Sequence, residues 1–108
     1  MLIPKTTIKH YDDGDGVEVD FYEDGVKIGT ACTCMYNRKP NSFLHSFEVN
    51  PKLRGKGYGT QILTYMIRKY DVDTLHISKT NRAINLYRRF GFRVADKFNK
   101  DMIIMKRK

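Results

Sequence analysis

The segment Arg54-Gly55-Lys56-Gly57-Tyr58-Gly59-Thr60 has the composition of an anion-binding loop. Glycines at alternate positions permit backbone angles that other residues avoid, so successive amide groups can converge on one point. A helix is expected to begin directly after the loop, and its N-terminus would add positive potential. Arg54 and Lys56 contribute two positive charges. These residues predict a site for a phosphate or a pyrophosphate.

Two common phosphate loops do not fit this segment. A Walker loop requires four residues between its first glycine and a Gly-Lys-Ser/Thr, and the chain has no such run. The dinucleotide fingerprint G-x-G-x-x-G fails because Thr60 takes the place of its last glycine. In addition, Ser78-Lys79 stand where an acidic residue would end the next strand. The spacing that is present is R-x-x-G-x-G.

The elements before the loop are predicted to be strands, because apolar and polar residues alternate there. Strands are expected at residues 7–11, 17–22, 26–31 and 43–49. An acidic turn at residues 12–16 follows the first strand, and Asp24-Gly25 is a hairpin signal between the second and third. A loop is expected at residues 37–42, and Asn50-Pro51 ends the fourth strand.

After the loop the period of the apolar residues becomes helical. A helix is expected over residues 57–70, with one apolar face made by Ile62, Leu63, Met66, Ile67 and Tyr70. A short strand at residues 75–78 precedes a second helix, which Thr80 or Asn81 can cap and Gly91 can stop. Residues 92–98 and 102–105 predict a closing hairpin. The chain is therefore expected to form one α+β domain over residues 1–108, with two main helices on a single mixed, mostly antiparallel sheet.

Two of these segments resemble motifs of one enzyme superfamily. The run V-N-P-K-L-R-G-K-G-Y-G-T, Val49 to Thr60, is similar to the acetyl-coenzyme A loop of the GNAT N-acetyltransferases. The run N-R-A-I-N-L-Y-R-R-F-G-F, Asn81 to Phe92, resembles that family's signature on its later helix. The motifs have the family's order and spacing, and together they cover residues 43 to 92. The resemblance implies a GNAT-like fold that binds acetyl-coenzyme A as the acyl donor.

The resemblance also implies roles for individual residues. The pyrophosphate would be held by the backbone amides of Gly55, Lys56, Gly57, Tyr58, Gly59 and Thr60, with Arg54 beside them. The backbone of Phe47 and Val49 would pair with the pantetheine arm, and Asn81 would hydrogen-bond that arm. Tyr87 would lie near the thioester sulfur, where a phenol can protonate or hydrogen-bond the departing thiolate. A tyrosine on an apolar helical stripe is also compatible with a core position.

Acyl transfer to an amine needs a base as well. Strand alternation predicts that His45, Phe47 and Val49 share one face, which would run toward the thioester. An imidazole, with a reference pKa of about 6.5, suits this work near neutrality. The run L-H-S-F-E-V resembles the arylalkylamine branch of the family, in which a histidine at this position is the base, directly or through water. That branch has a second histidine where this chain has Phe43. A structural strand histidine is the alternative reading, and Glu48, on the opposite face, is a weaker base.

Other residue types limit the chemistry further. Cys32 and Cys34 lie two apart on a strand, so both are expected on one face as reduced thiols, and neither a disulfide nor a zinc site is expected. No metal is expected. No run approaches the roughly 18 apolar residues of a membrane span, and no signal-peptide stretch is seen. We therefore expect a cytoplasmic protein that does not contact membranes.

The leading hypothesis is an N-acetyltransferase that transfers acetyl from acetyl-coenzyme A to a primary amine by direct attack. The acceptor is left open between a protein lysine or N-terminus and a small amine, and a longer acyl group is also left open. The net charge of +8 suits a phosphorylated cofactor but also nucleic acid. The alternative is a basic nucleic-acid- or protein-binding module on the same fold with weak or no catalysis. The intact glycine loop and Tyr87 make nucleic acid the less favoured partner.

One feature departs from the family pattern. Family members place one or two helices between the first two strands, and these helices wall the acceptor pocket. Only residues 12–16 separate the candidate strands here, so the chain would be a minimal form without these helices. An open acceptor side suits an amine that protrudes from a protein. It also suits a homodimer that closes the pocket, and the loop at residues 37–42 would form part of the wall.

Overall fold

The computed structural model describes residues 1–36, 39–97 and 99–107. The chain divides into two compact units, Met1–Val72 and Asp73–Lys108, and each is described by itself. The predicted single domain over residues 1–108 stays a prediction.

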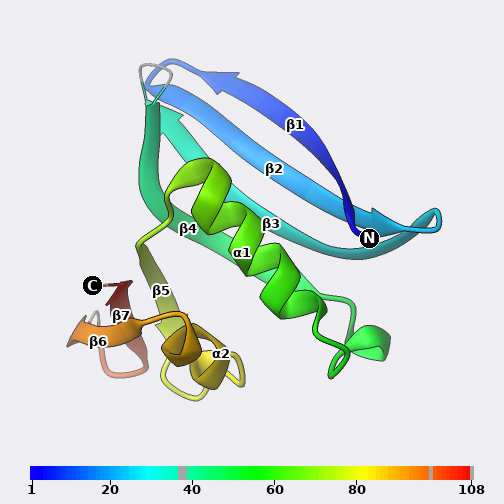
Figure 1. The fold of residues 1–108 in the computed structure, drawn as a ribbon. Helices are drawn as coiled ribbons and strands as arrows, with labels where there is room; N and C mark the ends of the chain where they lie inside the picture. The colour runs from blue at the N-terminus through cyan, green and yellow to red at the C-terminus, as the bar shows by residue number, and fades with distance from the viewer. Residues whose placement is uncertain (37–38, 98, 108) are drawn as a thin grey trace. The chain divides into compact units, whose positions relative to one another are not determined.

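The first unit is a four-stranded antiparallel meander with one helix. Its strands are β1 (Ile3–Tyr11), β2 (Gly14–Glu23), β3 (Val26–Tyr36) and β4 (Lys39–Val49), and each pairs with the next. A short 3-10 helix (Pro51–Leu53) leads to α1 (Tyr58–Tyr70). Figure 1 shows α1 lying across one face of these strands.

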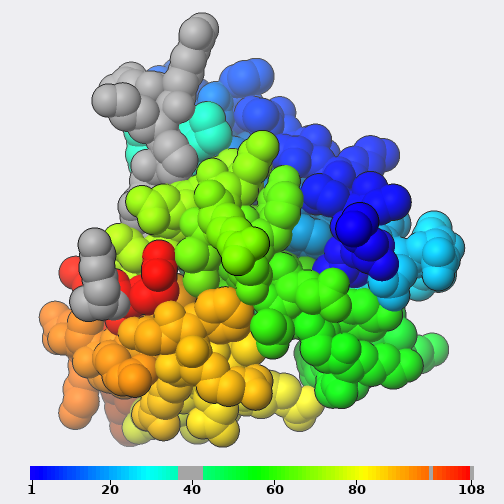
Figure 2. Space-filling model, viewed as in Figure 1, coloured from blue at the N-terminus to red at the C-terminus, as the bar shows by residue number. Residues whose placement is uncertain are grey.

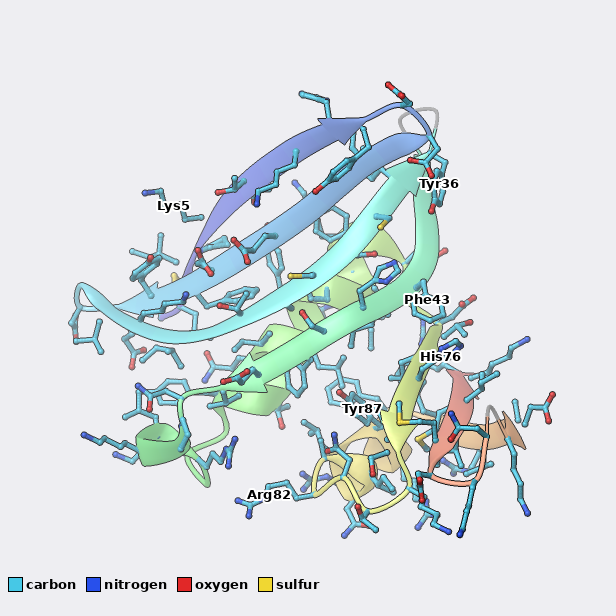
Figure 3. The ribbon with its side chains drawn as sticks, turned by 180° about the vertical axis from the view of Figure 1, so that it is seen from behind. Lys5, Tyr36, Phe43, His76, Arg82 and Tyr87 are labelled. Atoms are coloured by element: carbon cyan, nitrogen blue, oxygen red, sulfur yellow. The ribbon has the colours of Figure 1, made fainter. Side chains whose placement is uncertain are left out.

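The core of this unit lies between α1 and the sheet. The helix buries Ile62, Leu63, Met66 and Tyr70, as its apolar spacing predicts, while Ile67 is half-buried. The sheet contributes Val17, Val19 and Phe21 from alternate positions of β2. No described element of this unit covers the opposite face, which Figure 3 shows with Lys5 among its side chains.

The N-terminal hairpin is longer than the alternation of residues indicates. The ladder between β1 and β2 runs without a break from Ile3–Tyr22 to Tyr11–Gly14, which leaves only Asp12 and Asp13 as the turn. The predicted turn at residues 12–16 is therefore too wide. The structure confirms that no helix separates the first two strands.

The predicted loop at residues 37–42 is wrong over most of its length. Strand β4 begins at Lys39, whereas residues 37 and 38 lie outside the described part of the chain. Cross-strand pairs such as Tyr36–Lys39 and Met35–Pro40 extend the hairpin of β3 and β4 through a segment whose Pro and Asn favour turns. Pairing with β3 overrides this local preference.

The second unit is a three-stranded antiparallel sheet with one short helix. Strand β7 (Met102–Arg107) lies between β5 (Thr74–Ser78) and β6 (Phe92–Lys97), so the predicted closing hairpin is confirmed. Helix α2 (Ile84–Arg89) is shorter than its apolar pattern indicates. Asn81 begins the turn before it, because its side-chain oxygen accepts a 2.7 Å hydrogen bond from the amide of Ala83.

Candidate active site

The glycine loop has the backbone that its sequence predicts. Gly55 and Gly57 have φ angles of 81° and 82°, in the left-handed region that favours glycine. A Cβ atom added at either position would meet no atom within 4 Å. The backbone angle, and not crowding, is therefore what calls for glycine at both positions.

The amides of this loop are available to a ligand. Helix α1 begins at Tyr58 with Gly57 as its N-cap, and the amide of Gln61 makes the first helical bond, to the Gly57 carbonyl at 3.3 Å. Across the described residues, the amides of residues 55–60 donate to no backbone carbonyl. Unsatisfied amides at a helix N-terminus attract anions. Arg54 and Lys56 are exposed beside them. Figure 2 shows the segment around residues 50–60, coloured green, at the surface.

A hydrogen bond that the sequence did not indicate fastens this loop to the sheet. The Tyr58 hydroxyl donates to Oε2 of Glu23 at 2.5 Å, and Oε1 of Glu23 accepts from the Met1 amino group at 2.8 Å. These two bonds lower the pKa of Glu23, so the acceptor is a carboxylate. Tyr58 and Glu23 are 35 residues apart, and no spacing rule connects them.

Tyr58→Phe is therefore expected to weaken the binding of a pyrophosphate ligand at the loop roughly threefold, because the hydroxyl holds the loop against Glu23. Tyr65→Phe, on the same helix, is the matched control, since its ring contact with Phe21 does not use the hydroxyl. Equal dissociation constants for the pyrophosphate ligand in both variants and the parent chain would remove Tyr58 from this role.

His45 does not share a face with Phe47 and Val49, so that prediction is wrong. Between the pairs Cys32–Ser46 and Thr33–Leu44 the register advances by one residue in β3 and by two in β4. His45 is the extra residue of this β-bulge, which reverses the alternation of the strand. Leu44 is buried toward α1, whereas His45 is exposed on the opposite face. Glu48 lies on the same face of β4 as His45, the face away from α1. The prediction that the two residues lie on opposite faces is therefore also wrong.

The bulge places His45 against Cys34. The Sγ atom of Cys34 lies 3.1 Å from Nε2 of His45, and the Phe43 ring packs at 4.7 Å from the imidazole between ring centroids. Cys32 and Cys34 are both free thiols on one face of β3, as predicted. Burial, with smaller effects of Asp13 and Cys32, raises the pKa of the Cys34 thiol. The thiol is therefore neutral at rest.

A groove of about 560 Å³ lies on this face of the first unit, over β3 and β4. Its lining includes the carboxylates of Glu18 and Glu48, the hydroxyl of Ser46 and, near the glycine loop, Asn50. Lys27 also lines it, but its ammonium pairs with Asp20 at 3.3 Å. The groove is thus acidic on balance in a chain of net charge +8.

The second unit holds the remaining predicted site residues. Tyr87 is buried on α2, and its ring meets that of Phe92 edge-on at 5.8 Å between centroids. Burial raises the pKa of Tyr87, so the phenol keeps its proton and can donate a hydrogen bond. Asn81 is exposed in the turn before α2.

The described residues contain neither a metal-binding cluster nor a membrane-spanning helix. Among the described residues, no three side chains of His, Cys, Asp or Glu form a group that could hold a metal ion. Of the described helices, none is long and apolar enough to cross a membrane.

Comparison with known proteins assigns the family. Residues 4–92 match the model of the acetyltransferase (GNAT) family. The chain therefore belongs to the GNAT acetyltransferases, a family of N-acetyltransferase enzymes. No curated protein matches the sequence.

Solved structures show the same fold. A GNAT acetyltransferase from Elizabethkingia anophelis with acetyl-CoA bound has a TM-score of 0.66 at 14% identity, over 100% of this chain and 97% of that one. Arabidopsis thaliana Naa50 with the bisubstrate analogue CoA-Ac-MVNAL has a TM-score of 0.67 at 21% identity, over 84% of this chain and 72% of that one. Campylobacter jejuni N-acetyltransferase PseH with acetyl coenzyme A has a TM-score of 0.62 at 22% identity, over 86% of this chain and 69% of that one. The predicted α+β class, mixed and mostly antiparallel with two helices, is confirmed.

Proposed function

We propose that this chain transfers an acetyl group from acetyl-coenzyme A to a primary amine. The observation that carries the proposal is the loop at residues 54–60. Its left-handed glycines and its amides at the start of α1 suit a pyrophosphate. Acetyl-coenzyme A in structures of the same fold supports this ligand.

The coenzyme's arm is proposed to run back along β4 from this loop. The backbone of Val49 and then of Phe47 would pair with its amides, as an added strand pairs with a sheet edge. Asn81 would donate from its amide nitrogen, because its oxygen already accepts from Ala83. These roles follow from the family motifs, and Phe47 and Val49 lie on the strand that ends at the loop.

Two side chains are proposed to handle protons. His45 would act as base, because its imidazole is exposed and a neutral imidazole can accept a proton. Tyr87 would donate a hydrogen bond to the departing sulfur, which its neutral phenol can do at any ordinary pH. Direct attack of the amine on the thioester needs no other group.

The acceptor is proposed to be an amine that approaches the uncovered face of β3 and β4. The groove there presents Glu18 and Glu48, which attract an ammonium group and repel the phosphates of nucleic acid. Both a small amine and a lysine on a protein satisfy this chemistry. A cytoplasmic location and a homodimer that closes this face stay predictions.

Calorimetry with coenzyme A tests the proposal directly. We expect one site per chain with micromolar affinity, and acetylation of an amine panel followed by a thiol-detecting readout. Titration with a DNA duplex at two salt concentrations tests the alternative function of nucleic-acid binding. Tight, salt-dependent DNA binding without coenzyme A binding would establish the alternative of a basic binding module.

Gly57→Ala is expected to weaken coenzyme A binding at least tenfold. A side chain at φ 82° is strained, so the loop leaves the conformation in which its amides converge. Gly25→Ala is the matched control, because Gly25 has φ 78° in the β2–β3 turn and equally open space around a Cβ. The two variants should lose similar stability in thermal melts. If both bind coenzyme A equally well, the loop does not hold the pyrophosphate.

A further inference from the structure

Most of the net charge of this chain lies in its second unit. Residues 73–108 hold ten of the 20 Lys and Arg residues but only three of the 12 Asp and Glu residues, so this third of the chain accounts for +7 of the net +8. The first unit is twice as long and nearly neutral. The glycine loop, which belongs to the first unit, therefore does not explain why the chain is basic.

Four exposed cations of the second unit lie where α2 ends and β6 begins. They are Arg88, Arg89, Arg93 and Lys106, and we call them the basic surface. Arg88 and Arg89 are in the last turn of α2, Arg93 is the second residue of β6, and Lys106 of β7 is its cross-strand partner. None of the four forms an ion pair with a carboxylate in the described part of the chain. Figure 2 shows β6 and the end of α2, coloured orange, at the surface.

The guanidinium of Arg93 is held in a fixed position. Its Nη1 atom donates to the carbonyl oxygens of Arg88 at 3.0 Å and of Phe92 at 2.9 Å. Nε and Nη2 make no hydrogen bond to another described residue, so they form an exposed fork. Such a fork matches the two oxygens of a carboxylate, and an immobilised guanidinium loses little entropy when it binds one.

The basic surface also contains a repulsion that an anion would relieve. Arg93 and Lys106 are directly opposite each other on adjacent strands, where like charges destabilise the pairing. A carboxylate bound between them replaces this repulsion with two attractions. Solubility alone requires positive charge, but it does not require that two cations face each other.

The residues around Arg93 favour a protein over a nucleic acid. Val94 is 49% exposed and Ala95 is exposed as well, and such apolar side chains can pack on a protein but not on phosphates. Asp96 is exposed on the same face of the sheet as Arg93, where it repels phosphates. No described Phe or Tyr of the second unit is exposed for stacking on unpaired bases. Arginine beside apolar side chains is typical of protein interfaces.

We infer that the basic surface docks an acidic segment of a partner protein, a role beyond acetyl transfer. One carboxylate of the segment binds the Nε and Nη2 atoms of Arg93 and pairs with Lys106. Arg88 and Arg89 attract further carboxylates, and an apolar residue of the segment packs on Val94. The partner is thus defined by acidic residues interspersed with apolar ones.

The basic surface is distinct from the residues proposed to contact coenzyme A. Asn81 lies in the turn before α2, whereas Arg88 and Arg89 lie in its last turn. The helix has six residues and is therefore roughly 9 Å long. Docking of the partner and binding of coenzyme A are expected to be independent.

Fluorescence anisotropy of the full chain with a labelled peptide of Glu and Leu tests the inference. We expect binding in the micromolar range that weakens as salt is added. A peptide with Gln in place of every Glu should bind at least about tenfold more weakly. Coenzyme A should not displace the acidic peptide.

Variants with matched charge locate the binding site. Arg88→Gln combined with Arg89→Gln should weaken peptide binding about tenfold. Arg68→Gln combined with Lys69→Gln is the control, because these exposed cations lie in the last turn of α1 and their loss changes the net charge equally. The control should change the affinity less than about twofold. Arg93→Lys keeps the charge but loses the fork, and should weaken binding about fivefold.

Four results would overturn the inference. They are equal losses in the two double variants, no binding of the acidic peptide, its displacement by coenzyme A, and tighter binding of a DNA duplex or of single-stranded RNA at the same salt concentration. Calorimetry with coenzyme A separates this inference from the proposed function. Both double variants should bind coenzyme A as the parent chain does, and a parent chain that binds the peptide but not coenzyme A would overturn the proposed function alone.

Discussion

Tyr87→Phe is expected to lower kcat about 100-fold while the KM for acetyl-coenzyme A changes less than twofold. Losing one preorganised donor to a developing negative charge typically has an effect of this size on the chemical step. Phe keeps the ring that packs edge-on against Phe92. Steady-state kinetics with coenzyme A release as the readout measures both constants.

Tyr70→Phe is the control for this prediction. Tyr70 is also a buried tyrosine whose pKa is raised, chiefly by burial, but it is the last residue of α1 and has no role in the proposed chemistry. Its variant should keep kcat. A similar loss in both variants would indicate a general effect of removing a buried hydroxyl, and unchanged kcat in Tyr87→Phe would exclude the phenol from the reaction.

The pH dependence follows from the direction of the Tyr87 shift. Burial raises its pKa above the reference value of about 10, so the phenol stays protonated where an ordinary tyrosine would ionise. The parent enzyme should therefore show no loss of kcat from phenol ionisation below about pH 10. The folded state also favours the protonated phenol, so the corresponding stability is present below about pH 10 and is lost as the pH rises further.

Gly29→Ala is expected to destabilise the first unit by about 3 kcal/mol, or roughly 15 °C in melting temperature. A Cβ atom at Gly29 would collide with the carbonyl oxygen of Glu48 and lie 2.9 Å from Cδ1 of the fully buried Ile62. The carbonyl belongs to the adjacent strand, and Ile62 is held in the core. Neither can move aside without opening the contact of β3 with β4 or with α1.

Gly16→Ala provides the contrast on the neighbouring strand. Its Cβ would lie 3.2 Å from the ring of Tyr11, a side chain that is 62% exposed and can turn away. Thermal and denaturant unfolding should show a loss below about 1 kcal/mol there. If both variants lost the same free energy of unfolding, the close approach of other atoms to Gly29 would not be the reason that glycine is required there.

Features that depend on neighbouring residues could be predicted from the sequence. The turn Asp24-Gly25 has positive φ at both residues, as an Asp-Gly hairpin requires. The apolar spacing of α1 correctly identified its buried face. The left-handed glycines before α1 follow from composition in the same way. In each case the physical cause acts within a few residues of chain.

Features that depend on contacts between distant segments could not be predicted. The start of β4 at Lys39 depends on pairing with β3, which overrides the turn preference of Pro40 and Asn41. The bond from Tyr58 to Glu23 and the crowding of Gly29 depend on how α1 and β4 lie on the hairpin. Neither leaves a local signal, because each joins segments that meet only in the folded chain.

The sequence by itself indicated the family, the glycine loop before α1 and the kinds of side chain that the chain offers. The tertiary structure alone decided which face of β4 carries His45, and hence that its neighbour is Cys34. The reason is physical. Alternation assigns faces only while every residue advances the ladder equally, and a bulge, set by pairing with another strand, reverses the faces from that point onward.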